Sequence, residues 1–474
     1  MRLHKTLLSV MVMLAFASAA WAQTGRSMHV DLKETRLANG LRVITVEDHN
    51  APVIAVNVTY NVGSRNEKPG RTGFAHLFEH MMFQGSENVG KSEHFILIQN
   101  NGGTMNGTTN EDRTNYFEAL PSNQLELALY LESDRMRSLA VNQENLDNQR
   151  NVVQEERRIG LDNAPYGKSG EIQQELMYDN FAYKHDTIGS MSDLNAASVE
   201  DVSAFFKMYY APNNAVLTVV GDFKTPDALA TVKKYFENIP RQPDPPSVDM
   251  TEPEQKAERR TSVDDVLARA LRVAIAYKTV SGNTADFYAL QVLANVLGGG
   301  GGGFGGGFGG GGGGNSSRLY QKLVRDREMV TTVNSNSQET RGVGGFHVTA
   351  TLRGDVKAED VEAAIYEEIA RVQKEPIADW ELQKAKNSAR RNFINGLQSS
   401  LARANSIGQY AVYYNEPNLI NTRLDKVAAV TKEDVQRVAS KYLVQTNRTV
   451  VLTVPKGGGR GNPPPPVMQP PAMQ

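Results

Sequence analysis

Cysteine is absent from all 474 residues of the chain. This absence excludes disulfides, thiolate zinc sites, a cysteine nucleophile and a lipid-anchored cysteine behind an export leader. The chain also lacks a large excess of either charge. It has 51 basic and 53 acidic side chains, which leave a formal net charge of −2. With no strong global field, the composition gives no indication of a nucleic-acid partner. A chain of this length suits two or three domains and can bury a large core.

Apolar runs long enough to cross a membrane are missing beyond the first 22 residues. Residues 1–22 are typical of a secretory signal peptide, with Arg2 and Lys5 ahead of a short apolar run and a small-x-small cleavage pattern at 20–22. The alternative is an uncleaved anchor. The sequence therefore predicts a soluble mature protein, exported to the periplasm or secreted, with no membrane span after cleavage.

The most informative stretch is residues 73–83, which reads GFAHLFEHMMF. His76 and His80 are four positions apart, so on a helix both imidazoles can face one ion. Zinc accepts imidazole nitrogen and keeps one position open for water in catalytic sites. Glu79 reaches the edge of the same face, where a carboxylate can act as general base on zinc-bound water. The order H-x-x-E-H is the inverse of the commoner H-E-x-x-H.

The competing interpretation is an ordinary amphipathic helix whose two histidines hydrogen-bond in the core. The flanking side chains make this helix apolar almost all round, which predicts that it is buried. Two histidines and a glutamate in a buried helix need polar partners or a metal. We therefore favour a metal site, which still requires a third ligand.

Residues 142–158 are predicted to be helical and carry two candidate ligands. Glu156 shares its helical face with Val153 and Gln149, whereas Glu155 points about a third of a turn away. The pattern alone leaves open that both glutamates are solvated residues of a charged helix.

The rest of the pattern predicts elements and boundaries. In chain order these are a hairpin within 37–47 around Asn39-Gly40, a strand at 53–62, a helix at 92–100, paired strands at 102–109 and 114–120, and helices at 124–138, 142–158, 197–210 and 225–235. The predicted domains are a signal peptide at 1–22, a catalytic domain at 30–240, a linker at 241–262, an inactive homologous domain at 263–455 and a disordered tail at 456–474.

A repeat links the two predicted domains. The pattern from Ser198 to Asn214 recurs from Thr431 to Asn447, at an offset of 233 residues throughout. The second copy carries no H-x-x-E-H. A duplicated unit of this kind predicts an α+β protein with two similar halves that face each other across a cavity.

Residues 298–314 are glycine apart from Phe304 and Phe308. Such a run loses a large conformational entropy when it is fixed, so a flexible insertion is favoured. No Gly-Lys-Ser/Thr follows it, and nucleotide binding is discounted.

Together these features resemble the pitrilysin/insulinase-type zinc metallopeptidases, family M16, and within them the mitochondrial-processing-peptidase-like bacterial group. The stretches LANGL at 37–41, YAPNN at 210–214 and NSSRLY at 315–320 add to the likeness, which covers nearly the whole mature chain. The resemblance implies duplicated LuxS/metallohydrolase-like halves that enclose a peptide-binding chamber.

The resemblance also implies roles for single residues. His76 and His80 are expected to bind Zn²⁺, with Glu79 as the general base. Family spacing puts the third ligand 76 positions after the second histidine, which selects Glu156 over Glu155. Asn106 matches a family asparagine on the strand that receives substrate.

Two departures from the family pattern bear on activity. Gln149 stands where the family often has a glutamate that supports the metal ligands, so any support here comes from an uncharged amide. Members that work alone carry an arginine and, seven residues later, a tyrosine that hold substrate carbonyls. Arg325 fits the arginine, but Thr332 stands in place of the tyrosine. The prediction is a catalytic subunit of a heterodimer whose inactive homologue supplies an arginine–tyrosine pair, or a homodimer.

The expected activity is that of a zinc metalloendopeptidase acting on extended peptides or unfolded polypeptides, with broad specificity. A peptide is expected to pair with the edge strand at 103–108. The alternatives are a non-catalytic scaffold or peptide-binding subunit, and a zinc hydrolase of a non-peptide substrate.

Overall fold

The computed structural model describes residues 29–299 and 314–457. The predicted signal peptide, nearly all of the glycine-rich insertion and of the tail lie outside these ranges. None of the helices in the described ranges has both the length and the apolar content needed to span a bilayer.

The first half is built on a six-stranded sheet with the strand order β1-β2-β6-β3-β5-β4. Its strands are β1 (Lys33–Arg36), β2 (Arg42–Glu47), β3 (Val53–Tyr60), β4 (Thr104–Thr109), β5 (Thr114–Pro121) and β6 (Ala215–Gly221). Its helices are α2 (Phe74–Met81), α3 (Glu93–Asn100), α4 (Leu125–Ser138), α5 (Gln143–Arg157), α6 (Gly167–Met177), α7 (Phe181–Lys184), α8 (Met191–Ala196), α9 (Val199–Tyr209) and α10 (Thr225–Phe236).

The second half is built on a five-stranded sheet with the strand order β7-β11-β8-β10-β9. Its strands are β7 (Arg259–Asp265), β8 (Arg272–Lys278), β9 (Val330–Ser337), β10 (Gly345–Leu352) and β11 (Arg448–Pro455). Its helices are α11 (Ala285–Leu297), α12 (Ala358–Lys374), α13 (Asp379–Asn395), α14 (Ser400–Tyr414), α15 (Leu419–Ala428) and α16 (Lys432–Tyr442). A π-helical segment, Tyr320–Asp326, precedes β9.

The two halves are copies of one unit, as the sequence repeat predicts. Ser198 caps α9 and Thr431 caps α16, each in a capping box completed by an aspartate three residues later. Asn214 and Asn447 each donate a hydrogen bond of 2.8 Å to the main-chain oxygen of the tyrosine five residues before them. The repeated residues therefore make the same contacts in both halves, and the α+β fold of two homologous halves is confirmed.

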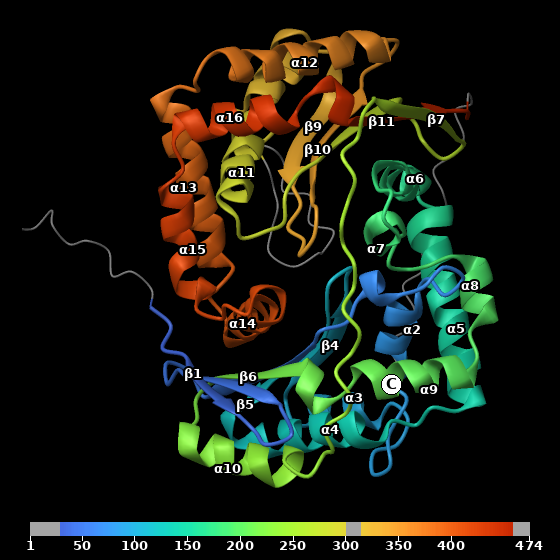
Figure 1. Ribbon diagram of the computed structural model, residues 1–474, viewed down its shortest axis with the longest axis vertical. Helices are drawn as coiled ribbons and strands as arrows, with labels where there is room; N and C mark the ends of the chain where they lie inside the picture. Colours follow the sequence, from blue (N-terminus) through green and yellow to red (C-terminus); the bar gives the residue numbers. More distant parts are fainter. Residues whose placement is uncertain (1–28, 300–313, 458–474) are drawn as a thin grey trace, which may run out of the picture.

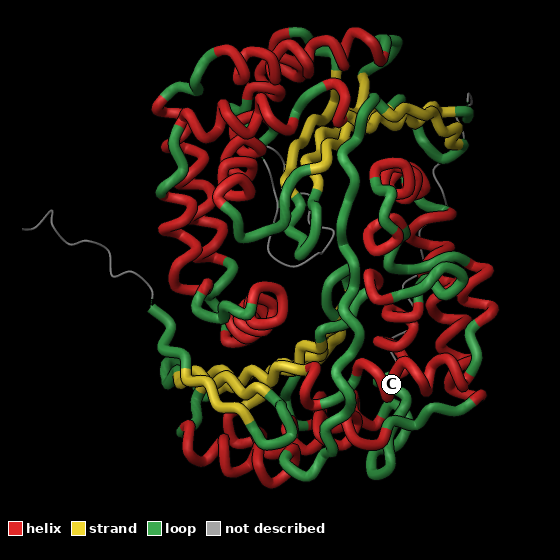
Figure 2. The backbone as a smooth tube through the Cα atoms, in the orientation of Figure 1, coloured by secondary structure: helices red, strands yellow, loops and turns green. Residues whose placement is uncertain are grey.

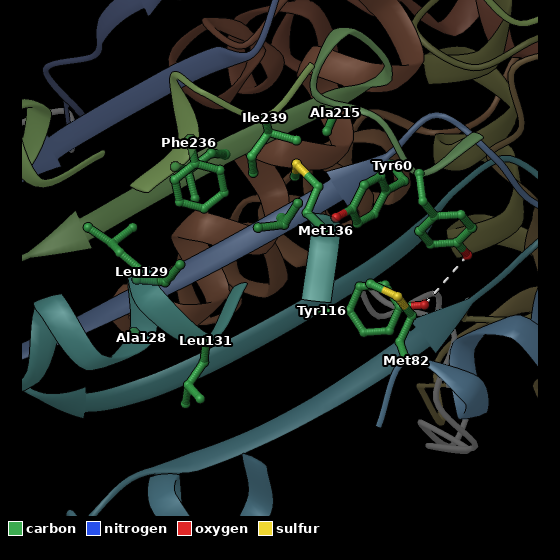
Figure 3. Close-up of a cluster of buried hydrophobic side chains, with 14 of the residues drawn as sticks. Tyr60, Met82, Tyr116, Ala128, Leu129, Leu131, Met136, Ala215, Phe236 and Ile239 are labelled. Carbon is green, nitrogen blue, oxygen red and sulfur yellow. Dashed lines mark hydrogen bonds between the residues drawn. The ribbon is translucent and has the colours of Figure 1, made fainter. Parts of the chain in front are cut away.

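A large apolar core fills one face of the first sheet. The strands contribute Tyr60 and Tyr116, and α4 contributes Leu129 and Leu131, all of them fully buried. Figure 3 shows part of this cluster. The Tyr116 hydroxyl also donates a hydrogen bond of 3.5 Å to that of Tyr210. This core holds α2 and α5 firmly beside the sheet.

The other face of each sheet is covered by a helix from the opposite half. Helix α14 belongs to the second half but packs on β3 and β6 of the first sheet, where Ile407 and Tyr410 join Ile44 and Val220 in one buried cluster. Helix α6 of the first half packs in turn on β8 and β11 of the second sheet. Figure 1 shows both helices beside the sheets that they cover. The halves thus complete each other's cores.

The connection between the halves differs slightly from the predicted linker at 241–262. Residues 241–258 form no helix or strand and run as a long loop from one half to the other, drawn green in Figure 2. The last four residues of the predicted linker already belong to β7, which pairs in parallel with β11.

Candidate metal centre

Helix α2 carries the H-x-x-E-H motif and is buried on most of its surface. Phe74, Leu77, Phe78 and Met81 pack into the core of the first half. The helix begins after Gly73, whose φ of +84° favours glycine. The apolar residues thereby fix the rotation of α2 and leave its two histidines facing α5.

The side chains of His76, His80 and Glu156 converge on one point. The Nε2 atom of His76 lies 3.7 Å from Oε2 of Glu156, and the Nε2 atom of His80 lies 3.4 Å from the same oxygen. Three ligand atoms held about 2.1 Å from one tetrahedral zinc ion would lie about 3.4 Å apart. The three side chains are therefore spaced as metal ligands are.

Helix α5 places Glu156 and keeps Glu155 away from this point. Gln149 and Val153 are buried on the face of α5 toward α2, and the carboxylate of Glu155 pairs with Arg158 at 2.9 Å. The side-chain oxygen of Gln149 lies 3.3 Å from Nδ1 of His80. A proton on Nδ1 that is donated to this amide leaves the lone pair of Nε2 directed at the cluster.

The electrostatics of the cluster favour a neutral His76 and charged forms of His80 and Glu156. Burial, reinforced by the neighbouring His80, lowers the pKa of His76 to about 4. Burial is the largest single influence on His80 and would lower its pKa, but the hydrogen bond to Glu156, the negative charges of Glu156 and Glu79 and the contact with Gln149 together raise that pKa. The same hydrogen bond lowers the pKa of Glu156. His76 is thus neutral near pH 7, the form that binds metal.

The side chain of Glu79 extends from α2 to Thr109 of β4, and 8% of the residue's surface is exposed. Its Oε2 atom accepts a hydrogen bond of 2.5 Å from the hydroxyl of Thr109. Burial raises the pKa of Glu79. A buried carboxylate of raised pKa is suited to accept a proton and to release it again.

The other predicted site residues are spread along two edge strands and a helical turn. Asn106 is exposed on β4, and its side-chain oxygen accepts a hydrogen bond of 2.9 Å from the amide of Gly107. Arg325 is exposed and donates to Gln321 at 3.3 Å, and Thr332 is exposed on β9. Within the described residues, none of the three predicted residues hydrogen-bonds to the histidine–glutamate cluster.

Three residues outside the predicted site hold the motif in place. Glu67 accepts hydrogen bonds from the amides of Gly73 and Ala75 at 2.9 and 2.7 Å, and so caps α2. His185 lies 2.9 Å from Glu67, and Thr109 holds Glu79. The contacts of His185 and Thr109 join residues 30 or more positions apart, so no local pattern marks them.

The arrangement fits a metal ion. Two imidazole nitrogens and a carboxylate oxygen face each other, and within the described residues they form the group of histidine and acidic side chains whose atoms lie close enough to share an ion. Zinc prefers this set of nitrogen and oxygen donors. The opposite ring nitrogen of His76, Nδ1, is buried without a hydrogen-bond partner, whereas that of His80 faces Gln149.

A cavity of about 480 Å³ lies where the halves meet. Its lining comes from both halves and includes the charged or polar side chains of Glu111, Glu171, Asp186, Arg272, Gln338 and His347. Residues from the segment that follows α5 and from the second sheet thus line one polar cavity.

Comparisons with known proteins extend over both halves. Residues 42–164 match the family model described as Insulinase (Peptidase family M16), and residues 196–389 match the Peptidase M16 inactive domain. The chain is 30% identical to zinc protease PqqE of Helicobacter pylori over 455 residues, 94% of this chain and 99% of that protein. It is 25% identical to a probable mitochondrial-processing peptidase subunit beta of Arabidopsis thaliana, over 87% of this chain and 76% of that one.

A solved structure has the same fold. The crystal structure of a protease from Helicobacter pylori superposes with a TM-score of 0.83 at 29% sequence identity, and the match covers 90% of this chain and 100% of that one. With its two matched domains and a relative that is similar along its whole length, the chain belongs to the M16 family of peptidases.

Proposed function

We propose that this protein is a zinc-dependent endopeptidase that hydrolyses extended peptides or unfolded polypeptides. The observation that carries the proposal is the convergence of His76, His80 and Glu156 at the spacing of metal ligands, with Glu79 one residue away on the same helix. These three residues would hold the ion. Zinc, when bound, supplies a Lewis acid that polarises a carbonyl and lowers the pKa of water.

The chain's own residues then supply the proton transfers and the orientation. Glu79 takes a proton from the attacking water and passes it to the nitrogen of the leaving amine. His80 is oriented by Gln149, and His76 remains neutral because it is buried. The buried position of Glu79 keeps bulk water from competing for its proton.

The substrate is proposed to bind as an added strand. Strand β4 lies at the end of the first sheet and pairs with β5 along one side, so its other edge can take main-chain hydrogen bonds from a peptide. Asn106 is exposed on this strand. The cavity between the halves reaches Glu111, in the turn that follows β4. Main-chain pairing reads the extended shape more than the sequence, which favours broad specificity.

The decisive experiment measures cleavage of fluorogenic peptides by the purified protein with and without a chelator. Cleavage is expected to stop on chelation and to return with zinc. The variant Glu79→Gln is expected to retain stoichiometric zinc while its turnover falls by at least about 100-fold. Zinc-loaded Glu79→Gln with full activity would refute the assigned base. A pure protein that binds no zinc would favour the alternative of a non-catalytic, peptide-binding subunit.

We further propose that the active form is a heterodimer with a homologous chain that lacks the metal motif. The supporting observation is Thr332, an exposed side chain on edge strand β9 that has no phenol to offer a substrate. The partner would supply the arginine–tyrosine pair, which this chain holds only in part because Thr332 stands seven residues after Arg325. Co-purification with homologous neighbours is expected to raise the peptidase rate; full activity of the single chain, unchanged by any such partner, would contradict this.

The site of action is proposed to be the periplasm or the medium, because the first 22 residues have the pattern of a cleaved leader. N-terminal sequencing of the mature protein is expected to begin at Gln23. A mature chain that starts at Met1 would contradict export by this route.

A further inference from the structure

We propose that Thr109 is a positioning residue, which holds one oxygen of Glu79 so that the other oxygen, Oε1, accepts the proton. This inference rests on the proposed function, because it gives Glu79 the role of base. It concerns the side chain that orients this base. None of the site residues expected from the motif has that role.

The geometry of β4 brings Thr109 to the base. Side chains at alternate positions of a strand share a face, so positions 107 and 109 both lie toward α2. The Thr109 hydroxyl is 2.5 Å from Oε2 of Glu79. Among the described residues, the Glu79 carboxylate accepts a hydrogen bond from no other group. One donor on one oxygen fixes the plane of the carboxylate.

Gly107 leaves the second oxygen uncovered. A Cβ atom at this position would lie 3.1 Å from Oε1 of Glu79 and 3.0 Å from its Cγ. A side chain there would press against this oxygen and the adjoining Cγ atom. Thr109 therefore binds Oε2 of Glu79, and the missing side chain at Gly107 leaves space beside Oε1.

The hydrogen bond can persist through the reaction. When Glu79 is ionised, Oε2 accepts from the Thr109 hydroxyl, and when a proton sits on Oε1, Oε2 is a carbonyl oxygen that still accepts. The proton comes from the attacking water and leaves to the amine of the cleaved bond, so the carboxylate is regenerated. Thr109 therefore needs no rearrangement during the cycle.

The end of β4 is itself held firmly, so Thr109 has a fixed position. Thr109 pairs with Thr114 across the β4–β5 hairpin. The Arg113 guanidinium, which is buried, donates a hydrogen bond of 2.7 Å to the main-chain oxygen of Thr108. The side-chain oxygen of Asn110 accepts from the amides of Asp112 and Arg113, both at 2.9 Å. This turn ties the strand end to the core.

The test compares Thr109→Val, which removes the hydroxyl at nearly constant volume, with Thr109→Ser, which retains it. Thr109→Val is expected to lower kcat by about 10- to 100-fold, the loss expected for one hydrogen bond to a charged group, with KM and zinc content unchanged. Thr109→Ser is expected to stay within about 3-fold of wild type. Thr45→Val, which changes a buried strand threonine in β2, is the matched control and should have wild-type kcat.

Three outcomes would overturn the inference: wild-type kcat in zinc-loaded Thr109→Val, an equal loss in Thr109→Ser, or a rise in KM alone. A crystal structure of Thr109→Val adds a measure independent of turnover, and there the Glu79 carboxylate is expected to rotate away from its present position. An unmoved carboxylate would reject the role of Thr109 even if activity fell. Failure of the proposed function itself would appear separately, as a wild-type protein without zinc-dependent cleavage.

Discussion

Glu156 and Glu155 are neighbours in α5 but differ in what their side chains reach. Glu156 lies within 3.7 Å of both histidine Nε2 atoms, whereas Glu155 pairs with Arg158 in solvent. Because α5 is fixed by the buried Gln149 and Val153, it cannot rotate to exchange them. At the scale of the residue, the helix register therefore decides which carboxylate can serve the metal.

The first prediction is that Glu156→Gln binds zinc more than about 100-fold more weakly, while Glu155→Gln stays close to wild type. Loss of a direct ligand should exceed the 10- to 100-fold loss typical of residues that only support ligands. Competition with a chromophoric chelator measures both affinities, and the Glu155 variant is the matched control. Equal zinc affinity in the two variants would contradict the choice of ligand.

At the scale of the element, α2 depends on a buried contact at its N-terminus. Glu67 accepts from the amides of Gly73 and Ala75, and His185 lies 2.9 Å from the same carboxylate. The second ring nitrogen of His185 lies 2.9 Å from the main-chain oxygen of Phe181. Both nitrogens thus face acceptors, an arrangement that favours the imidazolium form of His185 and secures the cap of the motif helix.

The second prediction concerns pH and stability. Burial is the largest single influence on His185 and would lower its pKa, but the hydrogen bond to Glu67, the charge of Glu67 and the main-chain acceptors together raise that pKa above the ordinary 6.5. The folded protein therefore holds this proton more tightly than the unfolded chain does. The resulting stabilisation is complete below about pH 6.5 and is lost as the pH rises through the folded-state pKa.

Urea denaturation at a series of pH values measures this effect. The unfolding free energy of wild type is expected to fall as the pH rises from about 6 to about 9, and His185→Gln should flatten that slope. His29→Gln removes an exposed histidine and serves as control. An unchanged slope in His185→Gln would show that the proton is not held there.

Elements such as α2, α5 and β3–β5 could be predicted to within two residues, because apolar periodicity and capping are local signals. The hairpin expected at 37–47 is offset in the structure: its first strand is β1, residues 33–36, and 37–41 form the turn. The reason is that β1 is a largely exposed edge strand without apolar alternation. The cap at Glu67 and the Thr109 contact arise only from tertiary packing, which a single sequence does not display.

At the scale of the whole molecule, the exchange of α14 and α6 makes the halves interdependent. An apolar stripe on α14 indicates that one face is buried, but not that it packs on the first sheet rather than the second. Ile407 is fully buried among residues of both halves. Neither half can bury both faces of its sheet alone, so the two are expected to unfold together.

The third prediction follows from this exchange. Ile407→Ala, in the second half, is expected to lower the unfolding free energy by about 2–5 kcal/mol and to accelerate hydrogen exchange of β3 and β6 amides in the first half. Ile96→Ala, at a 54% exposed position, is the control and should cost less than about 0.5 kcal/mol. Zinc added to the metal-free protein should raise the midpoint of the same single unfolding transition, because binding stabilises the folded protein as a whole. Two separate transitions, with zinc moving only one of them, would show that the exchanged helices do not couple the halves.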